Sequence, residues 1–411
     1  MANPMKNALR TSYWLPRHAF VGLLLEAARN RDGIRLLLGT QIDALEREPA
    51  GRLAVRFASG APVPRAAGSL LVGADGIRSA VRAKLEEWDG CHGGFVPRQF
   101  DSPAAGLRYK VLTLPGALSL ETPGGRKDLD SESMYSVRGA AKSSRKLKLG
   151  LLPSKSVYSR RTANLVTLAD DPVWDAADAE SFREYAERQW PHFPLASLVT
   201  EEELARFAAD RGGRFPRPQY SPRAAWAPPG PLDDGGAAPA AVLVGDALHA
   251  FPPDLGQGVN SALQDVMVLK EALDAEGDEH PSRAAARFQE ARVPEAAALV
   301  EMMRVAAPYQ YSQSAWGYRL WTWSFLARLL LNKVSKAFPL PAFMQVQDPE
   351  LSYSEATRLR TGAGGAARRR SGPPAEPGPL RSGLPAERFG RRSGLVPWSP
   401  GSPRCDTCHR R

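Results

Sequence analysis

The chain has 411 residues, of which 43% are hydrophobic and 24% charged, with a formal net charge of +10. At about 150 residues per domain this length gives roughly two or three domains, which excludes a small disulfide-stapled scaffold and a wholly disordered chain. The three cysteines are too few for a disulfide framework and predict a reducing compartment, with cytoplasm and organelle both open. No run approaches about 18 uninterrupted apolar residues, so no membrane-spanning helix is predicted.

The positive charge is concentrated at the end of the chain. Residues 360–411 contain 11 arginines and three acidic residues, which leaves a net charge of +2 for the first 359 residues. Apolar residues are scarce in this segment, a composition typical of disorder. We predict a disordered basic tail over 360–411, and no specific nucleic-acid-binding face on the rest of the chain. A basic interaction protein that acts through this tail remains an alternative.

Hydrophobic periodicity predicts the first elements. Apolar residues at helical spacing indicate a core helix over Phe20–Ala28. Short apolar or alternating runs predict strands over Ile34–Leu38 and Leu53–Phe57. The wholly apolar run Ser69–Gly73 is typical of a strand buried in a parallel sheet, and a helix over Ile77–Leu85 follows.

The second half of the chain changes character twice. Short alternating segments within 105–170 predict a largely antiparallel sheet, and residues 178–210 look helical. A loop rich in Pro and Gly then leads to a second buried strand. The remaining predicted elements are the loop 222–240, the strand Ala241–Gly245 and helices over Gly258–Leu273, Pro281–Ala306 and Trp316–Leu331.

The first motif that carries chemistry is the strand and turn from Leu71 to Arg82. Gly73 ends the buried strand and allows a tight turn. Asp75 then places a carboxylate at the carboxyl end of the strand, where open α/β sheets bind ligands. Aspartate also caps helices readily, so an ordinary helix cap is an equally good interpretation of Asp75.

The second motif runs from Val244 to Asn260. The strand ends in Gly-Asp, and Gly-Gln-Gly opens the next helix, whose N-terminus offers unpaired N–H groups and a positive dipole end. The glycines let a ligand approach the backbone closely, and Asp246 can accept hydrogen bonds from sugar-like hydroxyls. The motif predicts a site for a large, polar, partly anionic cofactor. His249 is interpreted as a hydrogen-bonding loop residue and not as a catalytic base.

Together these motifs resemble the second and third flavin-binding motifs of the group A FAD-dependent aromatic monooxygenases, which have the para-hydroxybenzoate hydroxylase-like fold. Within that family the nearest likeness is to the kynurenine 3-monooxygenases, and it covers about residues 12–359. Four further segments share the resemblance: Arg17 with the Leu-rich helix after it, Tyr109–Pro115, Glu301-Met302 and Tyr353–Ala356.

The resemblance implies an α/β fold with a Rossmann-like FAD-binding domain in two parts, 12–104 and 223–280. A β-sheet substrate domain over 105–222 and C-terminal helices over 281–359 complete the expected arrangement. Family members begin with a strand and Gly-x-Gly-x-x-Gly, which no residues before Arg17 match. The expectation is therefore an N-terminally truncated member that lacks the first strand and the Gly-rich motif.

The resemblance also implies the cofactors, FAD with NAD(P)H as the reductant, and a role for each matching residue. Asp246 would hold the ribityl chain, Pro253 would line the flavin ring, and Arg17 would contact the phosphate or ribityl region. Ile42 would offer backbone contact to the adenine, and Asp75 would support the site. The flavin supplies the chemistry, so no catalytic or metal-ligating side chain is predicted. The full cofactor-binding set is Arg17, Ile42, Asp75, Asp246, Pro253, Gly256, Gln257, Gly258, Val259 and Asn260.

The implied function is an FAD-dependent monooxygenase that hydroxylates an aromatic or related ring substrate with NAD(P)H and O2. Its alternatives are an epoxidase or other oxidase of the same fold and a non-catalytic remnant. Ala298 and Phe343 stand where kynurenine 3-monooxygenases have Asn and Tyr, which favours another or more apolar substrate. The helix over 316–331 either covers the substrate pocket or makes peripheral membrane contact.

Overall fold

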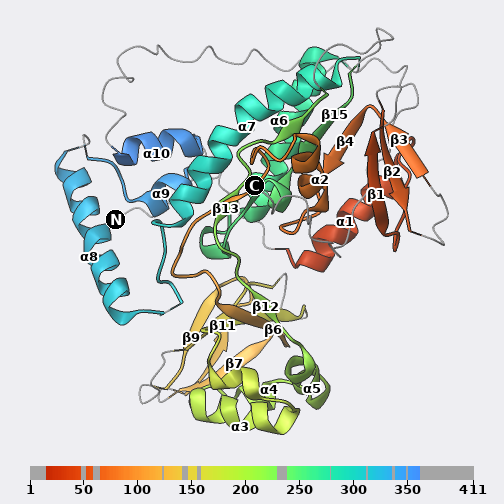
Figure 1. The fold of residues 1–411 in the computed structure, drawn as a ribbon. Helices are drawn as coiled ribbons and strands as arrows, with labels where there is room; N and C mark the ends of the chain where they lie inside the picture. The colour runs from red at the N-terminus through yellow and green to blue at the C-terminus, as the bar shows by residue number, and fades with distance from the viewer. Residues whose placement is uncertain are drawn as a thin grey trace, which may run out of the picture. The chain divides into compact units, whose positions relative to one another are not determined.

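The computed structural model has a mixed α/β fold, as the sequence predicted (Figure 1). Two compact units are present, and each is described by itself. Unit 1 comprises the described residues within Met1–Asn30, Gly106–Phe215 and Tyr309–Tyr318, and unit 2 those within Arg31–Ala105, Pro216–Pro308 and Arg319–Arg411. The structure describes residues 15–47, 52–58, 65–122, 125–140, 147–154, 159–228, 238–277, 279–311, 313–335, 338–348 and 350–361.

Unit 1 is built on a five-stranded antiparallel sheet with the order β12-β6-β11-β10-β9. This confirms the antiparallel sheet predicted from the alternating segments. A two-stranded hairpin, β7 with β8, belongs to the same unit. The strands are β6 (Arg108–Leu114), β7 (Leu118–Thr122), β8 (Gly125–Leu129), β9 (Tyr135–Arg138), β10 (Lys148–Leu151), β11 (Arg161–Thr167) and β12 (Gly213–Arg214).

Helices pack on one face of this sheet. In β6, Leu112 and Leu114 are fully buried in a core with Phe182 and Phe207 of the helices, while Tyr109 on the opposite face is 37% exposed. This alternation is the period of a strand with one covered face. The helices are α3 (Ala179–Gln189), α4 (Leu195–Leu198) and α5 (Glu201–Ala209), preceded by a 3-10 turn over Pro172–Asp175.

The first helix forms where periodicity predicted it, as α1 (Arg17–Arg29), but none of its residues is buried. Leu23 and Leu24 are 54% and 52% exposed. The expectation of a core helix is therefore wrong: spacing predicted an apolar stripe correctly but could not show whether another element covers it.

Unit 2 contains the two predicted apolar strands as parallel neighbours, although Leu70, Leu71 and Val72 of the first strand are only partly buried. β4 (Leu70–Gly73) pairs with β15 (Ala240–Leu243), and β14 (Ala225–Trp226) adds an antiparallel edge. α2 (Ala80–Trp88) follows β4. All four residues of β15 are fully buried, which is why its sequence is continuously apolar.

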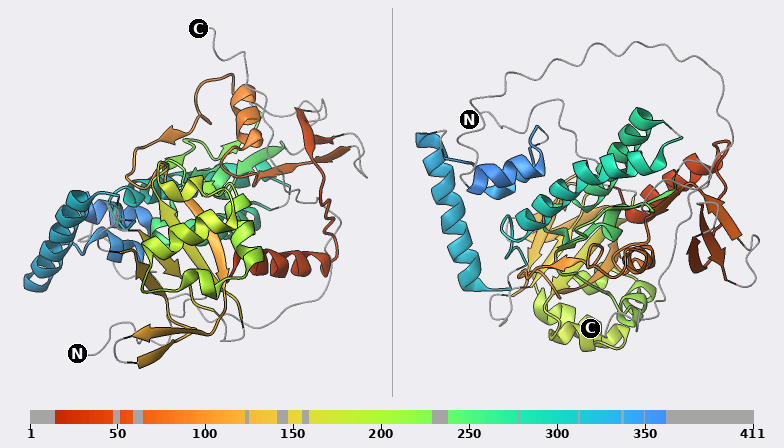
Figure 2. Two further views of the ribbon diagram at one scale, coloured as in Figure 1. Left: turned by 90° about the horizontal axis from the view of Figure 1, so that it is seen from below. Right: turned by 45° about the horizontal axis from the view of Figure 1, so that its top comes forward.

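Two long helices cover this sheet. α6 (Gly258–Glu276) and α7 (Pro281–Met303) lie side by side, and α7 also contacts β14 and β15 (Figures 1 and 2). Leu269 and Phe288 join the core of the sheet. α6 ends at Gly277, whose φ of +78° suits a glycine, and Pro281 is well placed in the first turn of α7.

The remaining elements of unit 2 are short, apart from a long late helix. Residues 34–38, predicted as a strand, pair with no described strand, and Leu38 is 52% exposed. The predicted basic tail lies outside the described residues, apart from 360 and 361. The other strands are β1 (Ile42–Arg47), β2 (Leu53–Phe57), β3 (Arg65–Gly68), β5 (Arg98–Gln99), β13 (Gln219–Tyr220) and β16 (His249–Ala250), and the helices are α8 (Ala315–Val334, which begins in unit 1), α9 (Ala342–Val346) and α10 (Tyr353–Thr361).

Candidate cofactor-binding site

The turns after β4 and β15 lie next to each other. Gly73 pairs with Leu243, and the N–H of Val244 donates to the carbonyl of Gly73 at 3.0 Å. Because the two strands are parallel, both turns leave the same edge of the sheet, the edge where α/β folds bind ligands. The structure thus brings together the two motifs that the sequence singled out.

Asp75 is occupied as a helix cap. Its Oδ2 accepts the N–H groups of Ala80 at 2.7 Å and Val81 at 3.0 Å, and its Oδ1 accepts the Ser79 hydroxyl at 2.6 Å. Ser79 in turn accepts the N–H of Arg82. The helix-cap interpretation of Asp75 is therefore confirmed, and its support of a cofactor stays a prediction.

Arg82 connects the two turns, a role that sequence reasoning did not assign. One guanidinium nitrogen donates to the carbonyl of Ala247 at 2.6 Å and another to that of Ile77 at 2.7 Å. Burial lowers the pKa of Arg82 from its ordinary value, and nearby Asp75 opposes that effect. A signal was present in the sequence, because Arg82 lies three residues before Leu85 on the face that periodicity assigns to the core.

The side chain of Asp265, on α6, holds the Gly-Asp turn at Gly245. Its Oδ1 pairs with Arg292 of α7, with Nε at 2.8 Å and a terminal nitrogen at 2.6 Å. Its Oδ2 accepts the N–H of Gly245 at 2.7 Å and contacts His249 Nε2 at 2.9 Å. Asp265 is fully buried and Arg292 is 1% exposed. This buried ion pair fixes the turn to the two helices, and neither member was predicted from the sequence.

His249 takes part in hydrogen bonding, as predicted, and its partners belong to α6. Besides Asp265, its Nε2 lies 3.2 Å from the hydroxyl of Ser261, and its ring stacks on Phe251. The side chain is 2% exposed, so it is enclosed by protein and serves to hold the loop.

The Gly-rich loop leaves backbone open to a ligand. Gly256 has φ +65°, and a Cβ built at Gly256 or Gly258 would meet no atom within 4 Å. The N–H of Ser261 makes the first helical bond of α6, to the carbonyl of Gln257 at 2.8 Å. The N–H groups of the three preceding residues therefore have no partner within the helix, and they lie at its positive end. Val259 in this first turn is 57% exposed.

Gln257 points its side chain inward. Its Oε1 accepts the hydroxyl of Tyr353 at 3.1 Å, and its amide donates to the carbonyl of Leu255. Burial raises the pKa of Tyr353, and the positive charge of Arg292 opposes this effect. Tyr353 belongs to the late segment that shared the family resemblance, so the structure gives that segment a contact with the Gly-rich loop.

The other predicted site residues are placed as follows. Asp246 is exposed in the 3-10 turn Gly245–Ala247, and Pro253 is exposed in the 3-10 turn Pro253–Leu255. Ile42 begins β1, pairs with Phe57 and buries its side chain. Arg17 begins α1 in unit 1 and is exposed.

These residues fit an FAD. An exposed carboxylate at Asp246 suits the hydroxyls of a ribityl chain. The open positions at Gly256 and Gly258 allow a flat ring system to approach the backbone, and the unpaired N–H groups of α6 suit a polar ring edge or an anionic group. The fit therefore rests on exposed hydrogen-bond donors and acceptors, which the buried side chains of Arg82 and Asp265 hold in position.

The chain resembles known flavoproteins. A family model described as an FAD binding domain matches residues 240–303. Kynurenine 3-monooxygenase of Salinispora arenicola (strain CNS-205) is 26% identical over 359 residues, covering 83% of this chain and 67% of the relative. Aurachin C monooxygenase/isomerase of Stigmatella aurantiaca is 30% identical over 261 residues, covering 63% and 55%. The crystal structure of Klebsiella pneumoniae HpxO complexed with FAD and uric acid has a TM-score of 0.48 and 18% identity, covering 74% and 67%.

The chain thus spans between about half and two thirds of the length of its curated relatives. The matched FAD-binding segment contains β15, the Gly-Asp turn, the Gly-rich loop, α6 and α7, which together build the site described above. This segment matches an FAD binding domain, and the chain as a whole is similar to curated monooxygenases.

Proposed function

We propose that this chain binds FAD and, with NAD(P)H and O2, oxygenates a small aromatic or related ring compound. The observation that carries the proposal is the set of exposed residues Asp246, Pro253, Gly256 and Gly258–Asn260. They lie in the matched FAD-binding segment, which Arg82 and Asp265 hold in place. FAD, when bound, supplies hydride acceptance and oxygen activation.

The protein's part in this function is to bind and orient. Asp246 accepts hydrogen bonds from sugar-like hydroxyls, and the first N–H groups of α6 donate to polar atoms of the cofactor. Arg82 holds the two turns together, because its buried guanidinium donates to a backbone carbonyl of each. Asp265 fixes the Gly-Asp turn to α6 by accepting the N–H of Gly245. Preorganised contacts of this kind lower the entropic cost of binding.

Flavin binding is the first test. The purified full chain is titrated with FAD, and the flavin absorption and fluorescence are followed. We expect saturable binding that Asp246→Ala weakens at least about tenfold. Asp274→Ala, in the exposed pair with Lys270 on α6, is the control and should bind like the wild type. Absence of FAD binding by the wild type overturns the proposal.

Turnover is the second test. NAD(P)H oxidation, O2 consumption and product formation are measured with a panel of ring compounds. Oxygen appearing in the product supports a hydroxylase or an epoxidase, which product analysis distinguishes. Substrate-independent oxidation of NAD(P)H with release of hydrogen peroxide indicates an oxidase. FAD binding without any oxidation of NAD(P)H favours a non-catalytic remnant.

The substrate we propose lacks an amino-acid carboxylate. Ala298 is 7% exposed in α7 and Phe343 is 36% exposed in α9, and neither can hydrogen-bond a carboxylate through its side chain. Kynurenine should therefore stimulate NAD(P)H oxidation less than ring compounds without that group. A kynurenine kcat/KM equal to or above theirs contradicts this assignment.

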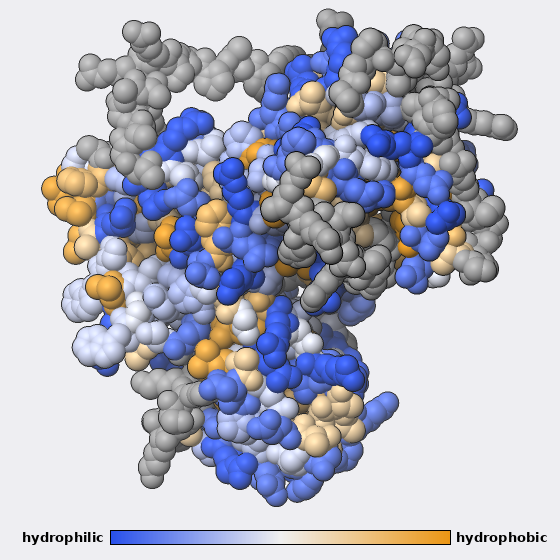
Figure 3. All heavy atoms as spheres, in the orientation of Figure 1, coloured by the Kyte–Doolittle hydropathy of each residue, from blue (hydrophilic) through white to orange (hydrophobic). Residues whose placement is uncertain are grey.

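We also propose that α8 lies on a membrane surface. Leu320, Trp323, Leu330 and Val334 share one helix face and are 75%, 72%, 63% and 84% exposed. Figure 3 shows apolar residues along this helix. The same helix carries Arg319, Arg328 and Lys333, which complement anionic lipids. Across the described residues, no helix has the length and hydrophobicity needed to span a bilayer.

Vesicle co-sedimentation tests this contact. The full chain is mixed with phosphatidylcholine vesicles containing about a third phosphatidylserine, an anionic lipid. Trp323→Glu with Leu330→Glu should abolish sedimentation. Met134→Glu, at an exposed apolar residue of unit 1, should not. Equal sedimentation of all three proteins rules out α8 as the contact.

A further inference from the structure

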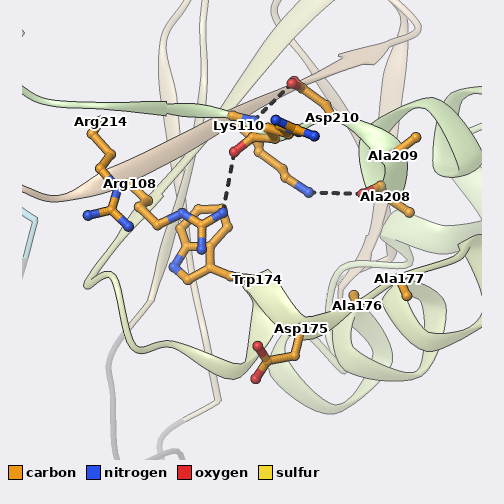
Figure 4. Close-up of a pocket in the computed structure, with 12 residues that line it drawn as sticks. Arg108, Lys110, Trp174, Asp175, Ala176, Ala177, Ala208, Ala209, Asp210 and Arg214 are labelled. Carbon is orange, nitrogen blue, oxygen red and sulfur yellow. Dashed lines mark hydrogen bonds between the residues drawn. The ribbon is translucent and has the colours of Figure 1, made fainter.

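A cavity of about 480 Å³ opens in unit 1, at the end of the helix-covered face of the five-stranded sheet (Figure 4). This volume lies in the range of small-molecule sites, about 300–1,000 Å³. All the residues that line it fall between 108 and 214. The cavity therefore contains no residue of the matched FAD-binding segment, and nothing inferred about it depends on the proposed function.

Three arginines on the wall lack a carboxylate partner. Arg108, Arg211 and Arg214 all line the cavity, and within the part of the chain that the structure describes none of them forms an ion pair. The guanidinium of Arg108 lies over the ring of Trp174, 4.7 Å from the centroid, and donates one bond to the carbonyl of Arg211 at 3.3 Å. The ring holds the guanidinium in one plane, and the four remaining N–H donors of Arg108 have no protein acceptor among the described residues.

A buried lysine adds to the positive potential. Lys110 is 3% exposed, and its Nζ donates to the carbonyls of Phe207 at 2.8 Å and Ala208 at 3.2 Å, near the end of α5. Burial lowers the pKa of Lys110, Asp210 opposes this, and the charge of Arg108 lowers it further. An anion in the cavity would offset the repulsion between these two cations.

Two carboxylates also reach the cavity but do not neutralise it. Asp175 is exposed at its rim, and Asp210 accepts the N–H of Gly212 at 2.9 Å. Neither forms an ion pair with a lining cation in the described structure. The lining contains four cationic side chains and two carboxylates, so its net charge is positive. A ligand that enters the cavity would contact the arginines.

The opposite wall is apolar and composed of small side chains. Ala176 and Ala208 are buried, and Ala177 and Ala209 lie beside them. On the arginine side, Trp174 adds an aromatic surface. We propose that this cavity binds a small organic anion, with its carboxylate or phosphate on the arginines and its apolar body against the alanines. Arginine suits both groups because its planar fork matches their oxygens.

Calorimetric titration of the full chain tests the proposal with four probes: inorganic phosphate, phenyl phosphate, benzoate and the neutral benzamide. We expect saturable binding of benzoate or phenyl phosphate, at least tenfold tighter than of benzamide. Phenyl phosphate binding more tightly than inorganic phosphate shows that the apolar wall takes part, and equal binding of the two contradicts that part of the proposal. The stronger of the two aromatic anions identifies the preferred acidic group.

Variants locate the site. Arg108→Gln should weaken binding at least tenfold. Arg214→Gln should also weaken it, and because the Arg214 side chain forms no hydrogen bond or ion pair with another described residue, this variant should fold like the wild type even if Arg108→Gln does not. Arg188→Gln, at an exposed arginine of α3 outside the cavity, is the matched control. Binding that survives both cavity variants, or benzamide binding as tightly as benzoate, overturns the proposal.

Discussion

Asp265 holds more of the candidate site together than any residue that the motifs identified. Two guanidinium nitrogens of Arg292 contact Oδ1 of Asp265. The N–H of Gly245 and the ring of His249 contact its Oδ2. The side chains of Arg292 and His249 are buried, whereas Asp246 in the turn is exposed. Asp246 was predicted to touch the cofactor, and its position depends on the buried carboxylate.

Asp265→Asn should destabilise the protein by about 3 kcal/mol, because it leaves the buried guanidinium of Arg292 without its counter-charge. Urea unfolding followed by far-UV circular dichroism measures the free energy of unfolding. The control is Asp274→Asn, also on α6, whose partner Lys270 is exposed, and its cost should stay below about 0.5 kcal/mol. A cost below about 1 kcal/mol for Asp265→Asn would show that the pair contributes little.

At the scale of elements, α5 is fastened to β6 by one carboxylate. Glu203 accepts the N–H of Thr113 at 2.6 Å and is paired with Arg206, whose Nε lies at 2.6 Å. Burial acts to raise the pKa of Glu203, but these hydrogen bonds and the charge of Arg206 outweigh it and hold the pKa below the ordinary 4.5. A carboxyl with a depressed pKa stabilises the folded state above its unfolded pKa, and that stabilisation disappears as the pH falls through the folded value.

Glu203→Gln should therefore lower the free energy of unfolding by about 1–2 kcal/mol at pH 7. Below pH 4.5 the difference between wild type and variant should shrink as the wild-type carboxyl takes up its proton. Urea titrations at a series of pH values between 7 and 3 measure this. Glu202→Gln, at the exposed neighbour on α5, serves as the control. A difference that is constant across the series would mean that the ionised carboxylate adds no stability.

Substitution by alanine should have different effects on stability at two glycines of unit 2, Gly73 and Gly258. A Cβ at Gly73 would lie 2.8 Å from Val81 Cγ1 and 3.0 Å from Leu243 Cδ2, between β4, α2 and β15. Gly73→Ala should cost about 1–3 kcal/mol of stability through overpacking. Gly258→Ala meets no atom within 4 Å, so stability should change by less than about 1 kcal/mol while FAD affinity falls. Unchanged FAD affinity of the Gly258→Ala variant would show that Gly258 does not belong to the cofactor-binding site.

For the whole molecule, the sequence predicted the two apolar strands and the antiparallel sheet, because continuous and alternating apolar patterns are typical of strands. It did not predict that the two apolar strands pair with each other. It could not predict the buried polar contacts. Arg292 and Asp265 are 27 positions apart, and nothing in their local sequence distinguishes them from exposed residues of α6 and α7. For the same reason the exposure of α1 was missed, since burial depends on tertiary neighbours that periodicity does not specify.

The charge of the molecule resides mostly beyond its last described element. Residues 362–411 carry 10 arginines and three acidic residues, so removing them lowers the net charge from +10 to +3. Binding of a basic segment to a polyanion is driven by counterion release and falls steeply with salt. Deletion after residue 361 should shift elution from a heparin column to lower NaCl, by about 0.2 M, and leave FAD affinity unchanged. A neutral Gly/Ser segment of equal length should reproduce the deletion. Unchanged elution would show that the first 361 residues make the polyanion contact, which would contradict the expectation from their small net charge.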